Sequence, residues 1–250
     1  MNELLEFDNH YHIYNHANGF ENLFRETKNY HFFLEKYKKH IQPIAETISW
    51  CLMPNHFHVL VRIKTRQEIL DYFQEQARLQ EELNRSDEFS SFENISKVPN
   101  FGNVESRKDE NLYADSKINS PVLLPNGKVL DEYFLSKQFA NFFSSYTQSF
   151  NKVYQRRGSL FIKNFKRVIV TNDNYYRNLV LYIHLNPIHH GFTSKELEWP
   201  WTSYLDFPEE FPALLQHYFG DLENYKWMHK QKILKFDEYD KIEADINESF

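Results

Sequence analysis

Two histidines, at positions 56 and 58, are separated by one residue inside the apolar stretch MPNHFHVLV (residues 53–61). In a β-strand successive side chains point to opposite faces, so His56 and His58 would share one face while Phe57 and Val59 pack on the other. Neutral imidazole is a common nitrogen ligand of metal ions, and the pair therefore indicates a two-histidine metal site. Histidines that face solvent or are satisfied inside the core would give the same pattern, so the choice depends on the rest of the chain.

A second pair of reactive groups lies in LVLYIHLNP (residues 179–187), where Tyr182 and Asn186 stand four residues apart. In a helix that spacing places them next to each other on one face, and Leu179 and Ile183 occupy the core-facing positions. The Tyr182–Asn186 stripe therefore need not be the buried one. A tyrosine hydroxyl can attack phosphorus once a cation stabilises the developing phenolate, and an asparagine carbonyl can ligate a metal or orient a phosphate. Packing alone would also explain a tyrosine on an amphipathic helix.

The charge of the chain is unevenly distributed. The net charge of −6 is accounted for by residues 205–250, which hold 11 acidic and 5 basic side chains. Residues 137–177 hold 8 basic side chains and one acidic side chain, which is the kind of local excess that binds phosphates. The side chains that we expect to contact a DNA backbone are Arg156, Arg157, Lys163, Lys166 and Arg167. A solvated basic helix face is the alternative.

The composition is that of a globular protein with a sizeable core, since 41% of the 250 residues are hydrophobic and 17% are aromatic. Cys51 is the single cysteine, which excludes an intramolecular disulfide. No apolar stretch is long enough to span a bilayer, and the first residues have neither the basic start nor the apolar centre of a signal peptide. We therefore expect a cytoplasmic protein with no membrane partner.

Hydrophobic periodicity and turn residues divide the chain into strands and helices. The expected strands are residues 7–19, 46–54, 56–63 and 159–170, and the expected helices are residues 27–41, 66–85, 130–155 and 171–186. This order predicts an α+β fold, with one mostly antiparallel sheet and its helices on one face. Pro187 and Gly191 are expected to end the last helix.

Two parts of the chain lie outside this pattern. The stretch of about residues 66–131 is expected to be an insertion, because much of it lacks a sustained apolar period. Residues 205–250 form an acidic extension that is expected to be helical. The predicted domains are thus residues 1–204, which include the insertion, and the helical C-terminal extension.

CLMPNHFHVLV and LYIHLNP together resemble the single-tyrosine HUH transposases, in particular the branch of REP-associated tyrosine transposases and similar insertion-sequence transposases. HUH denotes two histidines that flank a bulky hydrophobic residue, which here is His56-Phe57-His58. YHIYNHANG, RRGSLFIKNFKRV and EWPWTSY also resemble that family, and all five motifs occur in the family's order. The resemblance therefore covers most of residues 8–204, interrupted by the insertion.

The resemblance implies a ferredoxin-like core in which His56, His58 and Asn186 bind a divalent metal, Mg²⁺ or Mn²⁺. It implies that Tyr182 is the catalytic nucleophile and that the substrate is single-stranded DNA folded into a palindromic hairpin. Attack by Tyr182 would leave a 5′-phosphotyrosine link and a free 3′-hydroxyl, and reversal would join strands, as in a transposase. Such a strand transferase would be a monomer or a homodimer.

Other readings stay open. A domesticated protein could bind hairpin DNA without transposition, and a metal-dependent nuclease could hydrolyse DNA without a covalent intermediate. The second H-x-H motif, His10-Tyr11-His12, is interpreted as a substrate contact or as packing. His16 occupies a position where members of the family commonly have arginine, which puts a phosphate contact there in doubt. Three further histidines are expected on a helix surface, namely His184, His189 and His190.

Overall fold

The computed structural model describes residues 4–89, 121–195 and 198–233. The chain divides into two compact units, one made of Met1–Ile69 with Asp131–Phe250 and the other of Leu70–Leu130. The elements in chain order are β1 (His10–His16), α1 (Thr27–His40), β2 (Ala45–Met53), β3 (His56–Ile63), α2 (Arg66–Phe89), α3 (Glu132–Val153), β4 (Lys166–Ile169), α4 (Asp173–His189), α5 (Phe207–Glu210), α6 (Pro212–Phe219) and α7 (Leu222–Ile233). The domain boundary predicted between residues 204 and 205 stays a prediction.

The first unit is built on a four-stranded sheet in the order β2-β3-β1-β4. Each neighbouring pair is antiparallel, and the register places His16 opposite His56 and Tyr14 opposite His58. This strand order, with α1 between β1 and β2 and α3 between β3 and β4, is the ferredoxin-like arrangement. The predicted α+β class and the antiparallel sheet are therefore confirmed.

Alternation along the strands sorts the side chains between the two faces of the sheet. On β3, Phe57 packs against the aromatic side chains of α1 and α3, with a ring-centroid distance of 5.3 Å to Phe33 and 6.0 Å to Phe143. The even-numbered residues of the same strand, among them His58 and Leu60, face the other way. This face of β3 lies against α4, and Leu60 is buried in one cluster with the apolar residues of that helix.

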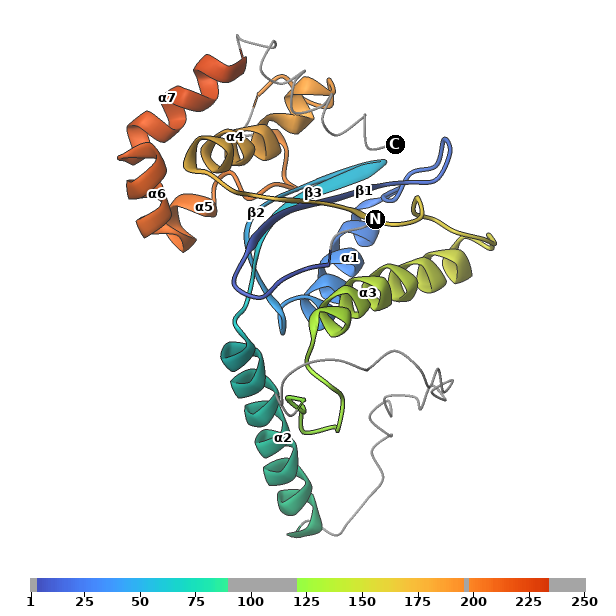
Figure 1. Cartoon of the computed structure of the whole chain (residues 1–250). Helices are drawn as coiled ribbons and strands as arrows, with labels where there is room; N and C mark the ends of the chain where they lie inside the picture. Colours follow the sequence, from blue (N-terminus) through green and yellow to red (C-terminus); the bar gives the residue numbers. More distant parts are fainter. Residues whose placement is uncertain (1–3, 90–120, 196–197, 234–250) are drawn as a thin grey trace. The chain divides into compact units, whose positions relative to one another are not determined.

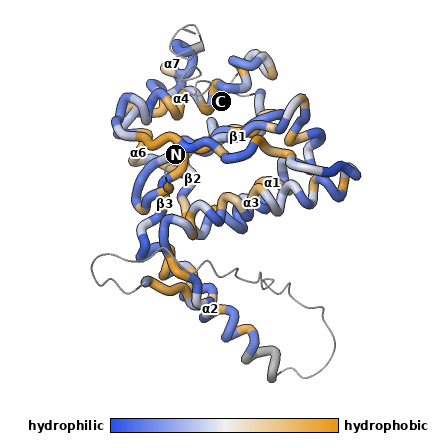
Figure 2. Tube along the Cα trace, turned by 45° about the vertical axis from the view of Figure 1, so that its right-hand side comes forward, coloured by the Kyte–Doolittle hydropathy of each residue, from blue (hydrophilic) through white to orange (hydrophobic). Residues whose placement is uncertain are grey.

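α1 and α3 cover one face of the sheet and pack against each other (Figure 1). Both helices contribute aromatic rings to the core between them, such as Phe33 and Phe142, whose centroids are 4.9 Å apart. Asp131 caps the start of α3 by accepting a hydrogen bond from the backbone N–H of Phe134. Figure 2 shows a mixture of hydrophobic and hydrophilic residues along these two helices, as expected for helices with one buried side.

α4 lies on the opposite face of the sheet, where it packs on β2 and β3 (Figure 1). The expectation that all helices share one face therefore holds for α1 and α3 and is corrected for α4. The reason is that the second half of α4 is buried all round: every residue from Leu179 to Pro187 is buried, between the sheet on one side and α6 and α7 on the other. The helix also continues through Pro187 to His189 instead of ending at the proline.

The outer edge of β2 is partly covered by the segment that precedes α5. The backbone N–H of Leu52 donates to the carbonyl of Trp201, and the N–H of Ser203 donates to the carbonyl of Trp50. Cys51 and Thr202 form the isolated bridge at the centre of this short pairing. One half of the β2 edge thus has a strand-like neighbour.

Two further differences from the expected elements concern length. The last strand was expected over residues 159–170, but β4 spans only Lys166–Ile169, because Asn164 adopts a left-handed conformation (φ 61°) that interrupts the extended chain. The helix expected over residues 66–85 is present as α2, while residues 90–120 of the predicted insertion lie outside the described residues. None of the helices in the described ranges has the length and apolar composition that a membrane crossing requires.

Candidate functional site

His56 and His58 lie together on the α4 side of the sheet, at the start of β3. They point to the same side, as predicted, but they are covered and not solvent-facing, with exposed fractions of 2% and 1%. Their ring centroids are 5.3 Å apart and the ring planes are nearly perpendicular. His16, which is paired with His56 across β1 and β3, stacks on it at 4.4 Å, and the exposed His190 approaches the His56 ring at 4.8 Å.

Tyr182 and Asn186 lie on the side of α4 that faces these histidines. The ring of Tyr182 is 5.3 Å from the ring of His58, and the side-chain oxygen of Asn186 is 3.2 Å from Nε2 of His56. The structure therefore brings together four side chains that are up to 130 residues apart in the sequence. The tyrosine–asparagine stripe, which the sequence did not require to be buried, is inside the core, since Tyr182 is 1% and Asn186 is 0% exposed.

Burial keeps the imidazoles of this site neutral. Burial lowers the pKa of His12 to about 3, and burial together with the nearby His190 lowers the pKa of His16 to about 4. The pKa values of His56 and His58 lie well below the ordinary value, first because of burial and then because of the neighbouring histidines. At neutral pH each ring therefore has one nitrogen with a lone pair, which is the form that binds a metal ion.

The hydrogen bonds of His56 suit a divalent cation. Its Nδ1 lies 2.7 Å from the side-chain oxygen of Asn55, and a neutral ring has a single N–H, so only one of its two nitrogens can donate. The shorter contact assigns the proton to Nδ1 and the lone pair to Nε2. That Nε2 atom faces the oxygen of Asn186, which also carries lone pairs, across 3.2 Å. Two ligand atoms about 2.1 Å from one ion and at right angles to each other would be about 3.0 Å apart. Without a cation the two lone pairs repel each other, whereas a cation bound by both atoms would attract both.

The amide nitrogen of Asn186 gives further support to this interpretation. It is buried and has no hydrogen-bond partner among the residues that the structure describes. An amide whose oxygen and nitrogen are both poorly satisfied costs stability, which indicates a function for it. In the described ranges no group of three or more His, Cys, Asp or Glu side chains is arranged to hold a metal ion. The candidate donors here are two imidazoles and one amide oxygen.

His184, expected on the helix surface, is instead the centre of a buried polar network. Its Nδ1 lies 3.1 Å from Nε2 of His229 and 3.1 Å from the hydroxyl of Tyr225, both on α7. Its Nε2 lies 3.0 Å from the hydroxyls of Ser49 and Ser203. The expectation failed because α7, which lies in the C-terminal extension, covers this side of α4. Of the other two histidines, His190 is exposed as expected, and His189 is half-buried.

The five predicted DNA-binding side chains have different environments. Arg156 is bound within the protein, since its guanidinium pairs with Glu21 at 2.6 Å and is only 15% exposed. Arg157 and Lys163 are exposed, and Lys166 lies opposite Tyr14 on the α4 side of the sheet. The DNA contacts of all five side chains stay a prediction.

Arg167 and Lys163 line a groove of about 540 Å³ between α3 and the segment that leads into β4. The guanidinium of Arg167 donates to the hydroxyl of Ser136 and lies 4.5 Å from the centre of the Phe165 ring. Among the described residues, the lining of the groove has three cationic side chains and no carboxylate. The other lining residues are hydroxyl, amide, aromatic or apolar residues, including one exposed tyrosine. Such a groove suits a phosphate backbone with unpaired bases.

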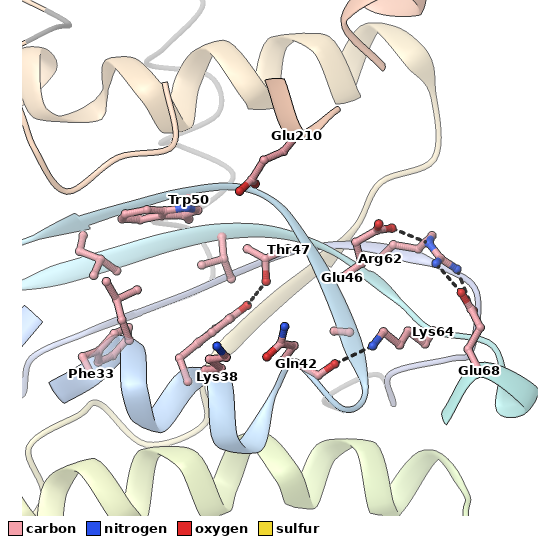
Figure 3. Close-up of a pocket in the computed structure, with 15 residues that line it drawn as sticks. Phe33, Lys38, Gln42, Glu46, Thr47, Trp50, Arg62, Lys64, Glu68 and Glu210 are labelled. Atoms are coloured by element: carbon pink, nitrogen blue, oxygen red, sulfur yellow. Dashed lines mark hydrogen bonds and ion pairs between the residues drawn. The ribbon is translucent and has the colours of Figure 1, made fainter. Parts of the chain in front are cut away.

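A second hollow, of about 550 Å³, lies beside the edge of β2 (Figure 3). Its cations are matched by carboxylates: Arg62 pairs with Glu46 at 3.0 Å and with Glu68 at 2.8 Å. Lys64 donates to the backbone carbonyl of Gln42. Because its positive charge is already neutralised, this hollow is a poor phosphate site.

The sequence interpretation did not assign His12 to the metal site. Its Nε2 is 2.9 Å from Nδ1 of His58, and its ring is 6.0 Å from that of Tyr182. The signal was present, because alternation in the first strand places His12 and His16 on one face. What was missing was the pairing of β1 with β3, which puts that face beside His56 and His58.

No family model matches the chain, and no curated protein matches its sequence. Among solved structures, the fold is similar to one described as a REP-associated tyrosine transposase bound to a REP hairpin. The similarity covers 82% of this chain and 84% of that chain, with 13% sequence identity and a TM-score of 0.47. At these values the likeness concerns the arrangement of elements, and the function has to be argued from the site itself.

Proposed function

We propose that the protein is a metal-dependent transesterase of single-stranded DNA, of the transposase type, which cleaves and rejoins strands through a 5′-phosphotyrosine on Tyr182. One observation carries this proposal: His56 and His58 of β3 meet Tyr182 and Asn186 of α4 on one face of the sheet. The set combines a hydroxyl nucleophile with three neutral donors for a cation, which is what phosphoryl transfer to a tyrosine requires.

In the proposed reaction the hydroxyl oxygen of Tyr182 attacks a backbone phosphorus. A bond forms between that oxygen and phosphorus, the bond from phosphorus to the 3′-oxygen breaks, and the phenol proton is transferred to the leaving 3′-oxygen. The products are a 5′-phosphotyrosine and a free 3′-hydroxyl. Attack by another 3′-hydroxyl reverses the step and restores the tyrosine, so no external energy source is needed.

His56, His58 and Asn186 would hold the divalent ion, for which Mg²⁺ or Mn²⁺ is proposed. When bound, the ion supplies positive charge that polarises the phosphate and stabilises the developing phenolate. The neutral imidazoles and the amide leave that charge undiminished, because none of them carries a negative charge. They also leave coordination positions to which phosphate oxygens can bind.

The groove that contains Lys163 and Arg167 supports DNA as the substrate. Its cations can neutralise phosphates, while the exposed ring of Tyr133 offers a surface on which a base can stack. The groove lies on the α3 side of the sheet, whereas Tyr182 lies on the α4 side. The DNA strand would therefore pass around the end of the sheet, where the exposed Arg157 and the Asn55 turn lie.

Burial of the nucleophile favours a second candidate, a hairpin-DNA-binding protein without catalytic activity. Tyr182 is 1% exposed, so a phosphate reaches its hydroxyl only after a rearrangement that opens the space between α4 and the sheet. A protein that only binds DNA has no need for such an opening. The two candidates make different predictions for a single assay.

The proposal predicts a covalent protein–DNA adduct. We expect wild-type protein, incubated with a labelled single-stranded hairpin oligonucleotide and Mg²⁺ or Mn²⁺, to give a complex that survives boiling in detergent. Tyr182→Phe should bind the oligonucleotide with nearly unchanged affinity and form no adduct, because only the attacking oxygen is lost. The measurement is denaturing gel electrophoresis together with a binding titration.

Tyr175→Phe and Tyr176→Phe are the matched controls, because they make the same change on the same helix, in its first turns. Both variants should form the adduct at the wild-type rate. Tight hairpin binding without an adduct would support the binding protein. Cleavage without an adduct would indicate a hydrolytic nuclease, and an adduct in Tyr182→Phe would show that another residue is the nucleophile.

A further inference from the structure

His12 and His58 are bonded to each other inside the sheet. They lie on neighbouring strands β1 and β3, two pairs apart in the register, and Nε2 of His12 is 2.9 Å from Nδ1 of His58. His12 is 0% exposed, which agrees with the interpretation of this histidine as packing in the described state. The remaining question is what a buried imidazole contributes at this point.

We propose that His12 is a positioning residue, which accepts a hydrogen bond from Nδ1–H of His58 and thereby presents the Nε2 lone pair of His58 to the divalent ion. This inference rests on the proposed metal-dependent function. It assigns a role to a residue outside the set of His56, His58 and Asn186.

The number of protons on two neutral imidazoles determines which nitrogen of His58 can bind a metal ion. Each ring has one N–H, and in a nitrogen-to-nitrogen bond one atom donates and the other accepts. If His58 donates from Nδ1, its Nε2 has a lone pair and can ligate. If His12 donates instead, the proton of His58 is on Nε2, which then cannot bind a metal.

His56 shows the same arrangement in the same site. Its Nδ1 donates to the side-chain oxygen of Asn55 at 2.7 Å, so its Nε2 faces Asn186. With His12 as acceptor, both candidate ligands would have Nδ1 bonded to a neighbouring side chain and Nε2 directed at the ion. Hydrogen bonds of this kind from metal-binding histidines fix the tautomer and the ring orientation.

Donation by His58 leaves the proton of His12 on Nδ1, and this atom is buried without a partner among the described residues. A buried N–H without an acceptor is unfavourable. The arrangement is therefore costly without the ion and is favoured once the ion binds Nε2 of His58. This explains why a polar atom without a partner is tolerated beside the site.

The test compares two substitutions at position 12 by the affinity for Mn²⁺, measured from the electron paramagnetic resonance signal of the free ion. His12→Gln retains an acceptor oxygen near the Nε2 position and should bind Mn²⁺ within about threefold of wild type. His12→Leu removes the acceptor at similar volume and should weaken binding by about 10- to 100-fold, as loss of such a partner does. His10→Leu, on the same strand but with its ring on Tyr176 at 5.3 Å, is the matched control and should bind as wild type does.

A second measurement needs no variant. Long-range ¹H–¹⁵N correlation spectra of the wild-type protein with Mg²⁺ should show the His58 proton on Nδ1, and a proton on Nε2 would overturn the proposal. Wild-type affinity in His12→Leu, or equal weakening in the Gln and Leu variants, would also overturn it, since the latter indicates packing alone. Absence of saturable Mn²⁺ binding by the wild type would instead refute the metal-dependent function, and the role of His12 with it.

Discussion

At the scale of single residues, the site is an assembly of groups that are poorly satisfied without a cation. The oxygen of Asn186 lies 3.2 Å from Nε2 of His56, and its nitrogen has no partner in the described part of the chain. Selection for stability alone would favour an apolar side chain at this buried position. The proposed role of the amide as a metal ligand would account for its presence here.

Replacing Asn186 by leucine separates its effect on the stability of the fold from its effect on metal binding. We expect Asn186→Leu to raise the free energy of unfolding of the metal-free protein by on the order of 1 kcal/mol, because a buried polar group without a partner is removed at nearly constant volume. The same change should weaken Mn²⁺ binding and slow adduct formation, since one ligand is lost. Urea unfolding in EDTA and a Mn²⁺ titration measure the two effects.

Leu185→Met is the control, because it changes a buried side chain of the same helix without changing its polarity. It should leave Mn²⁺ affinity unchanged. A less stable Asn186→Leu variant that still binds Mn²⁺ as tightly as the wild type would show that the amide serves the fold.

At the scale of elements, periodicity predicted the strands and helices well, because strand alternation and helical spacing are local properties. It predicted the shared face of His56 and His58 for the same reason. It could not predict the surroundings of Tyr182, because these depend on which element covers α4. Residues 179–187 of this helix are all buried, so it has no exposed stripe there. Helical spacing, which assigned Leu179 and Ile183 to the core, could not show that Tyr182 is buried as well.

The contact of His12 with His58 could not be predicted from the sequence for a related reason. It depends on the pairing of β1 with β3, and these strands are separated in the sequence by α1 and β2. The C-terminal network around His184 likewise joins residues 45 positions apart. Local patterns state which face a side chain is on and leave open what lies opposite.

The groove between α3 and the β4 segment leads to a prediction about salt. We expect the double substitution Lys137→Gln with Lys163→Gln to weaken single-stranded DNA binding for all sequences. The plot of log affinity against log salt concentration should become less steep, with the magnitude of its slope smaller by about 1.4, which corresponds to two lost phosphate contacts. Fluorescence anisotropy titrations at several salt concentrations give the slope.

The matched control is Lys38→Gln with Lys64→Gln, which removes the same charge from the hollow beside β2. Because carboxylates already balance the cations there, the slope should stay at the wild-type value. An equal fall in both double variants would show that total charge, and not the groove, determines binding.

At the scale of the whole molecule, the fold contains an unusual number of buried neutral histidines. Burial lowers the pKa of His12 to about 3 and of His229 to about 4, and it holds the pKa of His184 well below the ordinary value of 6.5. In the unfolded chain these groups take up protons near pH 6.5, whereas in the fold they do not. The unfolded state therefore binds more protons between about pH 4 and 6.5, and stability must fall as the pH falls through that range.

We expect the free energy of unfolding of the metal-free protein to be nearly constant above pH 7 and to drop steeply toward pH 4. One fully buried histidine with a pKa lowered from 6.5 to about 4 accounts for on the order of 3 kcal/mol at the acid end. Urea unfolding in EDTA at a series of pH values measures the curve. His229→Gln should make it shallower, because one buried ring that stays neutral in the fold is removed. A flat curve down to pH 4.5 would contradict the assignment of neutral buried rings.

The short pairing of residues 201–203 with the outer edge of β2 bears on how the protein avoids self-association. An unpaired strand edge is a template on which other chains can add strands and grow into aggregates. Here Trp201 and Ser203 occupy the backbone groups of Trp50 and Leu52 that an incoming strand would need. The opposite edge, β4, is only four residues long and contains Lys166 and Arg167. The described part of the sheet thus presents little unpaired edge to other copies of the chain.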